Sequence, residues 1–283
     1  MKIGVCVKLY PGDYIRFGDE KFAKIKSHGF DCVDYDMANT EKGIYLLTDS
    51  ELEAFLQKER ANAEKAGIEI SQVHGPWRSP RDLLEEDRQE RFEKMSKSIR
   101  ATAKLGCPYW VIHPLMPYTI RDIGTGHEQD TWDINLNFFT RLAAVAEECN
   151  VTICLENMPF PLFSIATPQK LQQLVQQIGH PNVQMCLDTG HVSIFPELSV
   201  GDCIRQIAPN LRVLHVHDND GTKDQHLWPK AGIIHWPDFT AALKDIQFQG
   251  VLSLEVSPEE TLSDEEFERD SRTLATLARS LTP

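Results

Sequence analysis

Two histidines separated by a single residue stand in the segment VLHVHDND, residues 213–220. Side chains two positions apart on an extended strand point to the same side, so His215 and His217 are expected to face one cavity. An imidazole beside an apolar run needs a partner for its polar nitrogens. A divalent metal ion is one such partner, because neutral imidazole is a common metal ligand.

Carboxylates and further imidazoles stand at the ends of other short β-branched runs. They are His74, His113, Glu156, Asp188 and Glu255, with His191 shortly after Asp188. Such a set, without thiolates, suits a divalent ion, with Mn²⁺ favoured and Mg²⁺, Co²⁺ or Zn²⁺ as alternatives. Each residue alone also fits a simpler role; Asp188 in LDTGH could form an Asx-turn before a helix.

The chain alternates short β-branched runs with longer amphipathic stretches. The expected strands are residues 2–7, 31–36, 68–74, 109–114, 151–157, 183–188, 212–218 and 251–257, and the expected helices include 50–66, 85–105, 133–149, 168–178, 236–247 and 264–281. Eight β–α units predict a single (β/α)₈ TIM barrel over residues 1–283 rather than an open sheet. Because barrel active sites lie at the C-terminal ends of the strands, the polar residues are expected to converge on one mouth.

Local signals support this division into elements. Gly67 stands where a helix C-cap is expected, and Thr167 followed by Pro168 fits a helix start. The longest irregular segment, residues 114–131, is expected to serve the active site as a lid. Tyr10, Arg121 and His127 lie in loops and are candidates for closing the site.

The bulk composition limits the classes of function. Acidic residues outnumber basic ones by 42 to 29, which gives a formal charge of −13 and disfavours binding to nucleic acid or anionic membranes. No apolar stretch approaches the roughly 20 residues of a membrane span, and no secretory signal is evident. The seven cysteines, without a CxxC motif, predict a reduced, cytoplasmic protein.

Six segments taken together resemble the xylose-isomerase-like barrel superfamily, which includes sugar isomerases and epimerases as well as endonuclease IV. They are VHGPW, VIHP, CLENMP, CLDTGH, LHVHDND and LSLEVS, in this order along the chain. The resemblance implies carbohydrate metabolism and one metal ion held by Glu156, Asp188, His215 and Glu255. It also implies that the two glutamates are the catalytic acid/base pair and that His191 contacts the substrate.

The resemblance to endonuclease IV implies a larger ligand set, able to hold three zinc ions. The matching positions are His74, His113, Glu156, Asp188, His191, His215, Asp224, His226 and Glu255. The sequence departs from its relatives at residues 228–231, where many of them carry a Gly-Glu-Gly turn. Leu162 and Gly221 stand where relatives acting on free ketoses carry a glutamate and an arginine, so a different substrate is expected.

The function expected from these residues is a metal-dependent isomerase or epimerase of a sugar or sugar phosphate. A proton would leave the carbon next to a carbonyl, and the metal ion would stabilise the resulting enediolate. The alternatives are an abasic-site nuclease, a sugar lyase or dehydratase on the same barrel, and a sugar-binding protein without activity. A homodimer or a larger homo-oligomer is also expected, as such barrels often dimerise.

Further residues are assigned to the surroundings of the site. Additional metal or substrate contacts are expected from His74, His113, His191, His217, Asp224 and His226, and a substrate pocket from Trp77, Phe160, Trp228 and Lys230. Candidates for meeting a phosphate are Lys8, Arg16, Arg78, Arg121 and Lys230. Asp218 or Asp220 is expected to orient an imidazole from behind.

Overall fold

The computed structural model describes residues 1–8, 16–77, 84–256 and 261–283. Eight parallel strands form one sheet in the order β8-β7-β6-β4-β3-β2-β1-β9. Their bounds are β1 Ile3–Lys8, β2 Cys32–Asp36, β3 Glu69–His74, β4 Tyr109–Ile112, β6 Thr152–Glu156, β7 Val183–Asp188, β8 Leu211–His215 and β9 Leu252–Leu254. Each overlaps an expected strand, so the strand pattern of the sequence is confirmed.

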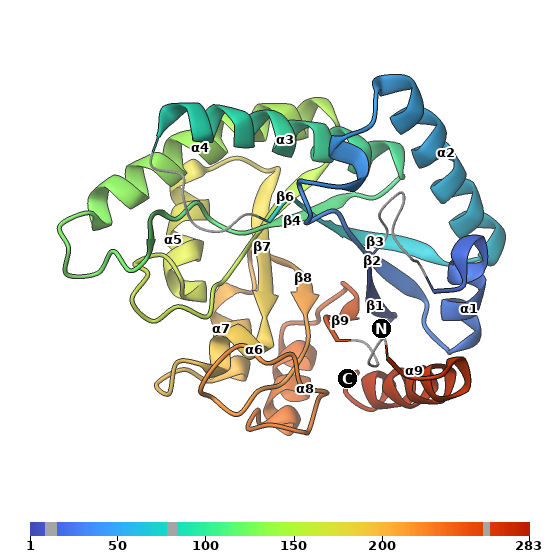
Figure 1. The fold of residues 1–283 in the computed structure, drawn as a ribbon. Coiled ribbons are helices and arrows are strands. Elements are labelled where there is room, and N and C mark those ends of the chain that lie inside the picture. The colour runs from blue at the N-terminus through green and yellow to red at the C-terminus, as the bar shows by residue number, and fades with distance from the viewer. Residues whose placement is uncertain (9–15, 78–83, 257–260) are drawn as a thin grey trace.

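The sheet closes on itself between β8 and β9. A parallel bridge joins Val216 to Leu254. The backbone N–H of Val216 donates to the carbonyl of Ser253 at 2.9 Å, and the N–H of Glu255 donates to the carbonyl of Val216 at 3.1 Å. With helices around the strands (Figure 1), this closure confirms the (β/α)₈ barrel.

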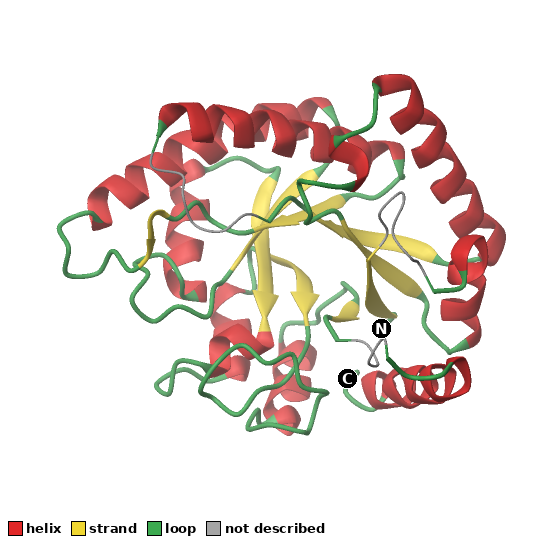
Figure 2. Cartoon of the chain, in the orientation of Figure 1, coloured by secondary structure: helices red, strands yellow, loops and turns green. Residues whose placement is uncertain are grey.

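Helices surround the barrel (Figure 2). They are α1 Lys21–Ser27, α2 Asp49–Ala66, α3 Glu85–Lys104, α4 Glu128–Glu148, α5 Pro168–Ile178, α6 Thr189–Ser193, α7 Val200–Ile207, α8 Trp236–Asp245 and α9 Asp264–Arg279. Short 3₁₀ turns lie at Gly18–Glu20 and Gly43–Tyr45. Among the described residues, every helix is too short or too polar to cross a lipid bilayer.

The ends of α2 and α5 show the expected capping chemistry, whereas α4 starts earlier than expected. Gly67 ends α2 in the left-handed conformation at φ 65°, and the Thr167 side chain accepts from the N–H of Lys170 at the start of α5. Helix α4 begins five residues before the expected position 133, because its first turn is mostly polar and exposed and gives no apolar periodicity. The segment 114–131 therefore contains the short strand β5 (Pro117–Ile120) and the first turn of α4.

The barrel interior contains two layers. The lower layer is a small apolar cluster of Val111, Cys154, Cys186 and Val213, all fully or almost fully buried. The positions two residues further along the same strands or just beyond them are His113, Glu156, Asp188 and His215. Because the side-chain period of a strand is two, both layers point into the barrel. All seven cysteines are free thiols.

Candidate metal centre and active site

Four side chains from four neighbouring strands meet at the barrel mouth. Glu156, Asp188, His215 and Glu255 each offer a ligand atom, and these atoms all lie within 4.8 Å of one another. His215 Nδ1 is 2.9 Å from Glu156 Oε1 and 3.2 Å from Glu255 Oε2. The first three residues are fully buried, whereas the Glu255 side chain keeps 20% of its surface exposed. Strands β6 to β9 thus bring together the four residues that the resemblance implied as metal ligands.

The oxygen atoms of this quartet fit a cation. Glu156 Oε2, Asp188 Oδ2 and Glu255 Oε2 are buried and have no aligned hydrogen-bond partner among the described residues. A buried carboxylate oxygen without a partner is costly, and three of them around one point attract a positive charge. Oxygen and imidazole nitrogen together suit a divalent ion of the Mn²⁺ or Zn²⁺ type.

Asp188 combines a structural and a chemical role on separate atoms. Its Oδ1 accepts from the N–H of His191 at 2.7 Å and so caps α6, as an Asx-type residue does. Its Oδ2 is left over and lies 3.0 Å from His217 Nε2. The capping role that the sequence suggested therefore leaves one oxygen free to act as a ligand.

A carboxylate of β2 orients His215 from behind. Asp34 Oδ2 lies 2.9 Å from His215 Nε2 and also accepts from the Gln72 side-chain amide at 2.9 Å. This contact holds the ring so that Nδ1 faces the other carboxylates. The residue did not stand out in the sequence, because an aspartate inside a predicted strand carries no local sign of a partner 181 positions away.

The expected orienting residues, Asp218 and Asp220, have other roles. Asp218 is buried and accepts from the backbone N–H groups of Asn219, Lys230 and Ile234 and from the indole N–H of Trp236, so it organises the loop after β8. Asp220 accepts from Thr222 and Gln225 within the same loop. Both carboxylates are saturated by nearby donors, so that expectation is wrong.

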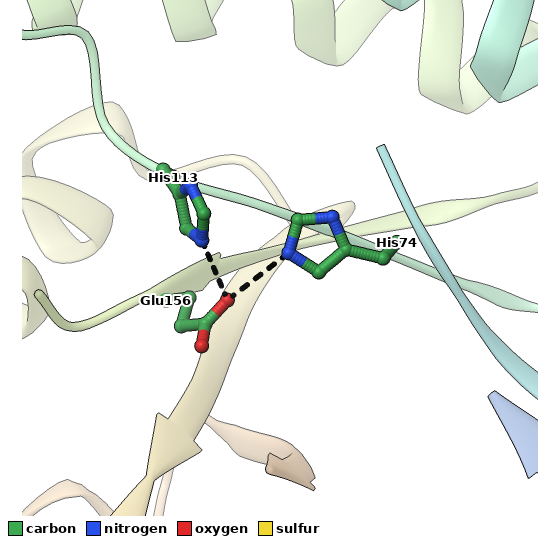
Figure 3. Close-up of side chains that lie close together, drawn as sticks. All are labelled: His74, His113 and Glu156. Atoms are coloured by element: carbon green, nitrogen blue, oxygen red, sulfur yellow. Dashed lines mark ion pairs between the residues drawn. The ribbon is translucent and has the colours of Figure 1, made fainter. Parts of the chain in front are cut away.

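Two further histidines approach the second carboxylate oxygen of Glu156 (Figure 3). His113 Nε2 lies 3.2 Å and His74 Nε2 3.6 Å from Glu156 Oε2. Together with Glu156 they form a second group of atoms within 4.8 Å of one another. Glu156 is thus shared between this group and the quartet.

A third group lies beside Asp188. His191 Nε2 and His226 Nε2 are each 3.2 Å from Asp224 Oδ2. The His217 ring stacks on the His226 ring with centroids 4.1 Å apart. His217 and His215 are both fully buried within these linked groups. All ten expected metal or substrate residues therefore lie in one connected cluster, although their roles stay predictions.

The carboxyl groups of the cluster have different pKa values, because each has different neighbours. Burial raises the pKa of Glu255 to about 7, against the attraction of the His215 imidazole. Burial also opposes ionisation of Glu156, but the neighbouring His215 and His113 rings hold its pKa well below its usual range. For Asp188, burial is outweighed by His191 and His217, which lower its pKa to about 2.

The pKa values of the histidines in the cluster also differ from one another. Burial lowers the pKa of His113 to about 4, so this ring is neutral at neutral pH. Burial acts in the same direction on His74, but the carboxylate of Glu156 overrides it and raises its pKa to about 9. Against the same burial effect, Asp188 and Asp224 raise the pKa of His191 to about 10.

A cavity of about 750 Å³ opens onto this cluster. His74, His113, His191, Asp224, His226 and Glu255 line one end, and Trp77 and Phe160 belong to its wall. Among the described lining residues, Trp228 and Lys230 are absent. Trp228 packs against the core, and the Lys230 ammonium donates to Ser280 Oγ at 3.0 Å, so neither faces the cavity.

The loop that replaces the Gly-Glu-Gly turn is a tight turn with its own anchors. Lys230 adopts φ 73°, and its backbone N–H donates to Asp218 Oδ2 at 3.1 Å. The N–H of Ala231 donates to the carbonyl of Trp228 at 3.0 Å. Of the other loop candidates, Arg121 and His127 are exposed, while Tyr10 and Arg78 lie outside the described residues.

Comparisons with known proteins agree with this architecture. A family model described as a xylose isomerase-like TIM barrel matches residues 22–274. A D-psicose 3-epimerase of Enterocloster bolteae is 23% identical over 267 residues, which cover 90% of this chain and 82% of the relative.

Solved structures share the fold over almost the whole chain. A D-psicose 3-epimerase from Clostridium cellulolyticum H10, solved with D-tagatose, has a TM-score of 0.77 at 21% identity and covers 99% of both chains. The IOLI protein, solved with a binding zinc atom, has a TM-score of 0.73 at 20% identity and covers 99% of this chain and 96% of its own. At these identities the likeness concerns the fold.

Proposed function

The chain belongs to the xylose isomerase-like TIM barrel family, and from this premise we propose that it is a metal-dependent sugar epimerase or isomerase. One observation carries the proposal: the ligand atoms of Glu156, Asp188, His215 and Glu255 lie within 4.8 Å of one another, and three of their carboxylate oxygens have no aligned hydrogen bond among the described residues. The name of the similar D-psicose 3-epimerase supports the reaction class.

The quartet would hold one divalent ion, for which we favour Mn²⁺, with Mg²⁺, Co²⁺ and Zn²⁺ as alternatives. A bound ion supplies Lewis-acid stabilisation of the negative charge that develops on the substrate oxygens. Asp34 keeps the His215 ring in its orientation, and Asp188 is fixed by its bond to the N–H of His191. These positions are set by buried hydrogen bonds, which favours a site that is organised before the substrate arrives.

We assign the proton transfers to the two glutamates of the quartet. Glu255 lines the cavity and is partly exposed, so its carboxylate can reach a substrate that is held there. Glu156 is fully buried beside His215, whose positive charge favours the ionised form of the carboxylate. We therefore assign Glu255 to the first proton abstraction next to the carbonyl and Glu156 to the second transfer.

The cavity supports an uncharged sugar better than a sugar phosphate. Among the described lining residues, the cationic side chains of Arg16 and Lys21 are already engaged by carboxylates. Arg16 pairs with Asp264 at 2.6 Å and Lys21 with Glu59 at 2.8 Å. A phosphate that bound to Arg16 or Lys21 would have to displace the carboxylate partner of that side chain. Manganese as the resident ion, the cytoplasmic location and self-association stay predictions.

Isotope exchange tests the proposal directly. The metal-loaded protein is incubated in D₂O with a panel of ketoses and keto-sugars, and deuterium at the carbon next to the carbonyl is measured by mass spectrometry. We expect exchange with at least one sugar and a loss of at least about a hundredfold in Glu255→Gln, as general-base catalysis typically contributes 10²–10⁴-fold. Glu197→Gln is the matched control, because Glu197 is exposed and is not among the described lining residues.

Two results of the exchange experiment would contradict these assignments. Full exchange in Glu255→Gln would remove this residue from the chemistry. No exchange with any sugar, in protein shown to contain metal, would overturn the assigned reaction class.

A second candidate function is an abasic-site nuclease. It is favoured by one observation: the nine positions that match endonuclease IV lie in three linked groups around Glu156 and Asp188. The net charge of −13 weakens the case, since repulsion between the protein and DNA phosphates opposes binding. Incision of an abasic duplex by the metal-loaded protein would support the nuclease, and its absence together with sugar exchange would exclude it.

A further inference from the structure

The cavity at the barrel mouth has a second part that the proposed chemistry does not use. Beyond the metal-binding end it continues between α1 and α9, two helices that lie beside each other in Figure 1 and are joined by an ion pair of Lys24 with Glu268 at 2.6 Å. We call this part the α1–α9 crevice and define it by six lining residues: Phe17, Ile25, His28, Phe30, Phe267 and Leu274.

The polarity of the crevice does not suit a sugar ring. The whole cavity, at about 750 Å³, is in the range that holds a drug-sized ligand, so a single monosaccharide at the metal-binding end does not fill it. Five of the six crevice residues are apolar. Sugar hydroxyls placed against them would lose their bonds to water without replacement. An apolar group would instead gain from leaving water.

A charged group is also disfavoured there. Arg16, at the margin of the crevice, donates to Asp264 and to the carbonyl of Leu262. Lys21 is buried with Glu59, and both side chains keep only 4% exposure. The structure therefore favours a neutral occupant.

The aromatic rings of the crevice indicate the shape of that occupant. Phe17 and Phe267 meet edge to face with centroids 6.1 Å apart, and Phe17 meets the His28 ring at 6.4 Å. The guanidinium of Arg16 lies 4.5 Å from the centre of the Phe267 ring. Rings arranged in this way offer edges and faces to a further aromatic ring at preferred geometry.

One polar atom in the crevice has no partner. His28 is only 5% exposed, and its Nε2 is buried without a hydrogen-bond partner among the described residues. Burial lowers its pKa, which keeps the ring neutral. A neutral imidazole nitrogen left unpaired in an apolar crevice is satisfied by a ligand hydroxyl.

We propose that the α1–α9 crevice binds a hydroxylated aromatic substituent, so that the substrate is a sugar carrying an aryl group, with the sugar at the metal site and the aryl hydroxyl on His28 Nε2. This inference rests on the proposed function, because it takes the metal site as the place of the sugar.

Binding of simple glycosides to the metal-loaded protein tests the crevice without requiring turnover. Calorimetry compares 4-hydroxyphenyl, phenyl, n-hexyl and methyl β-D-glucosides, which share one sugar. We expect 4-hydroxyphenyl glucoside to bind at least about tenfold more tightly than the methyl compound, since burial of a ring is worth more than one decade of affinity. We expect the phenyl compound to lie between them.

Two test variants and one control variant locate the effect. Ser271 of α9 is buried and lines the cavity beside the crevice, so Ser271→Phe should fill it and remove the advantage of the aryl compounds. Thr273→Phe, on the exposed face of the same helix, is the matched control. His28→Leu should abolish the difference between the 4-hydroxyphenyl and phenyl compounds and keep their advantage over methyl. Circular dichroism checks that each variant is folded.

Several outcomes would overturn the proposal. Equal affinities for the four glucosides in the wild-type protein would remove the subsite, whether or not the variants fold. An n-hexyl compound that binds as tightly as the phenyl compound would remove the aromatic assignment. Aryl binding without proton exchange in any sugar would contradict the proposed function alone, and exchange in free sugars without aryl preference would contradict this inference alone.

Discussion

The two layers inside the barrel are built by the same strands and have opposite character. Cys154 and Glu156 stand two residues apart on β6, and Val213 and His215 stand two residues apart on β8. The lower residues form a small apolar cluster, in which only the Cys186 thiol reaches within 4.8 Å of Glu156 and His215. The upper residues bring carboxylates and imidazoles within 4.8 Å of one another. A rise of roughly 6.6 Å along a strand, two residues at about 3.3 Å each, thus separates a layer that stabilises the fold from one that is costly without a cation.

The comparison predicts that substitutions in the upper layer change metal binding, and that substitutions in the lower layer change stability. The strongest test is Glu156→Gln, which removes the carboxylate shared by two ligand groups. We expect Mn²⁺ affinity to fall by at least about a thousandfold, more than the 10–100-fold typical of an outer partner, and the Mn²⁺-induced rise in Tm to disappear. Calorimetric titration and thermal melts measure both, and near-normal affinity would break the comparison.

Asp34 of β2 supports the upper layer through its contact with His215. Asp34→Asn keeps the shape but weakens the charge-assisted bond to His215 Nε2. We expect a loss of about 10–100-fold in metal affinity, and a similar loss in proton exchange, with little change in the substrate KM. Asp220→Asn is the control, because Asp220 bonds only within its exposed loop in the described structure. Equal effects of the two substitutions would contradict the role of Asp34.

Val213→Ala tests the lower layer on the strand that carries His215. The side chain is buried, so the truncation leaves a small cavity and should lower the free energy of unfolding by about 1–2 kcal/mol. Metal affinity should change less than about threefold, because the backbone of β8 stays paired with β7. Urea denaturation of the metal-free protein measures the stability. A large loss of metal affinity would show that the layers are coupled.

The pH dependence of metal binding is the finest test of the upper layer. In the metal-free protein Glu255 has a pKa of about 7, so below this pH a proton must leave before the carboxylate can bind metal. As the pH falls below 7, the affinity for the metal ion should therefore decrease with each pH unit. This decrease should be about tenfold larger per unit than the decrease above pH 7. The break near pH 7 should be absent in Glu255→Gln. Its persistence in that variant would assign the proton to another group.

Much of the fold and of the site was predictable from the sequence, because the relevant signals are local. The alternation of strand and helix patterns fixed eight parallel strands, and barrel geometry then placed every polar strand end at one mouth. His74, His113 and Asp188 end strands or follow them directly, so their convergence needed no knowledge of contacts. The early start of α4 was missed, because its polar first turn has no apolar periodicity.

Contacts between distant segments required the tertiary structure. Asp34 and His215 are 181 residues apart and meet only because the barrel closes. The expected partners Asp218 and Asp220, adjacent in sequence, are held instead by their own loop. The α1–α9 crevice likewise exists only because β9 pairs with β1 and brings the last helix beside the first.

The sequence by itself therefore determined which side chains point into the barrel and from which strand, since side-chain direction follows from a period of two along each strand. Only the tertiary structure decided which atoms face one another, which oxygens are left without partners and where the cavity extends. Those properties depend on strand register, burial and packing between segments that share no local signal.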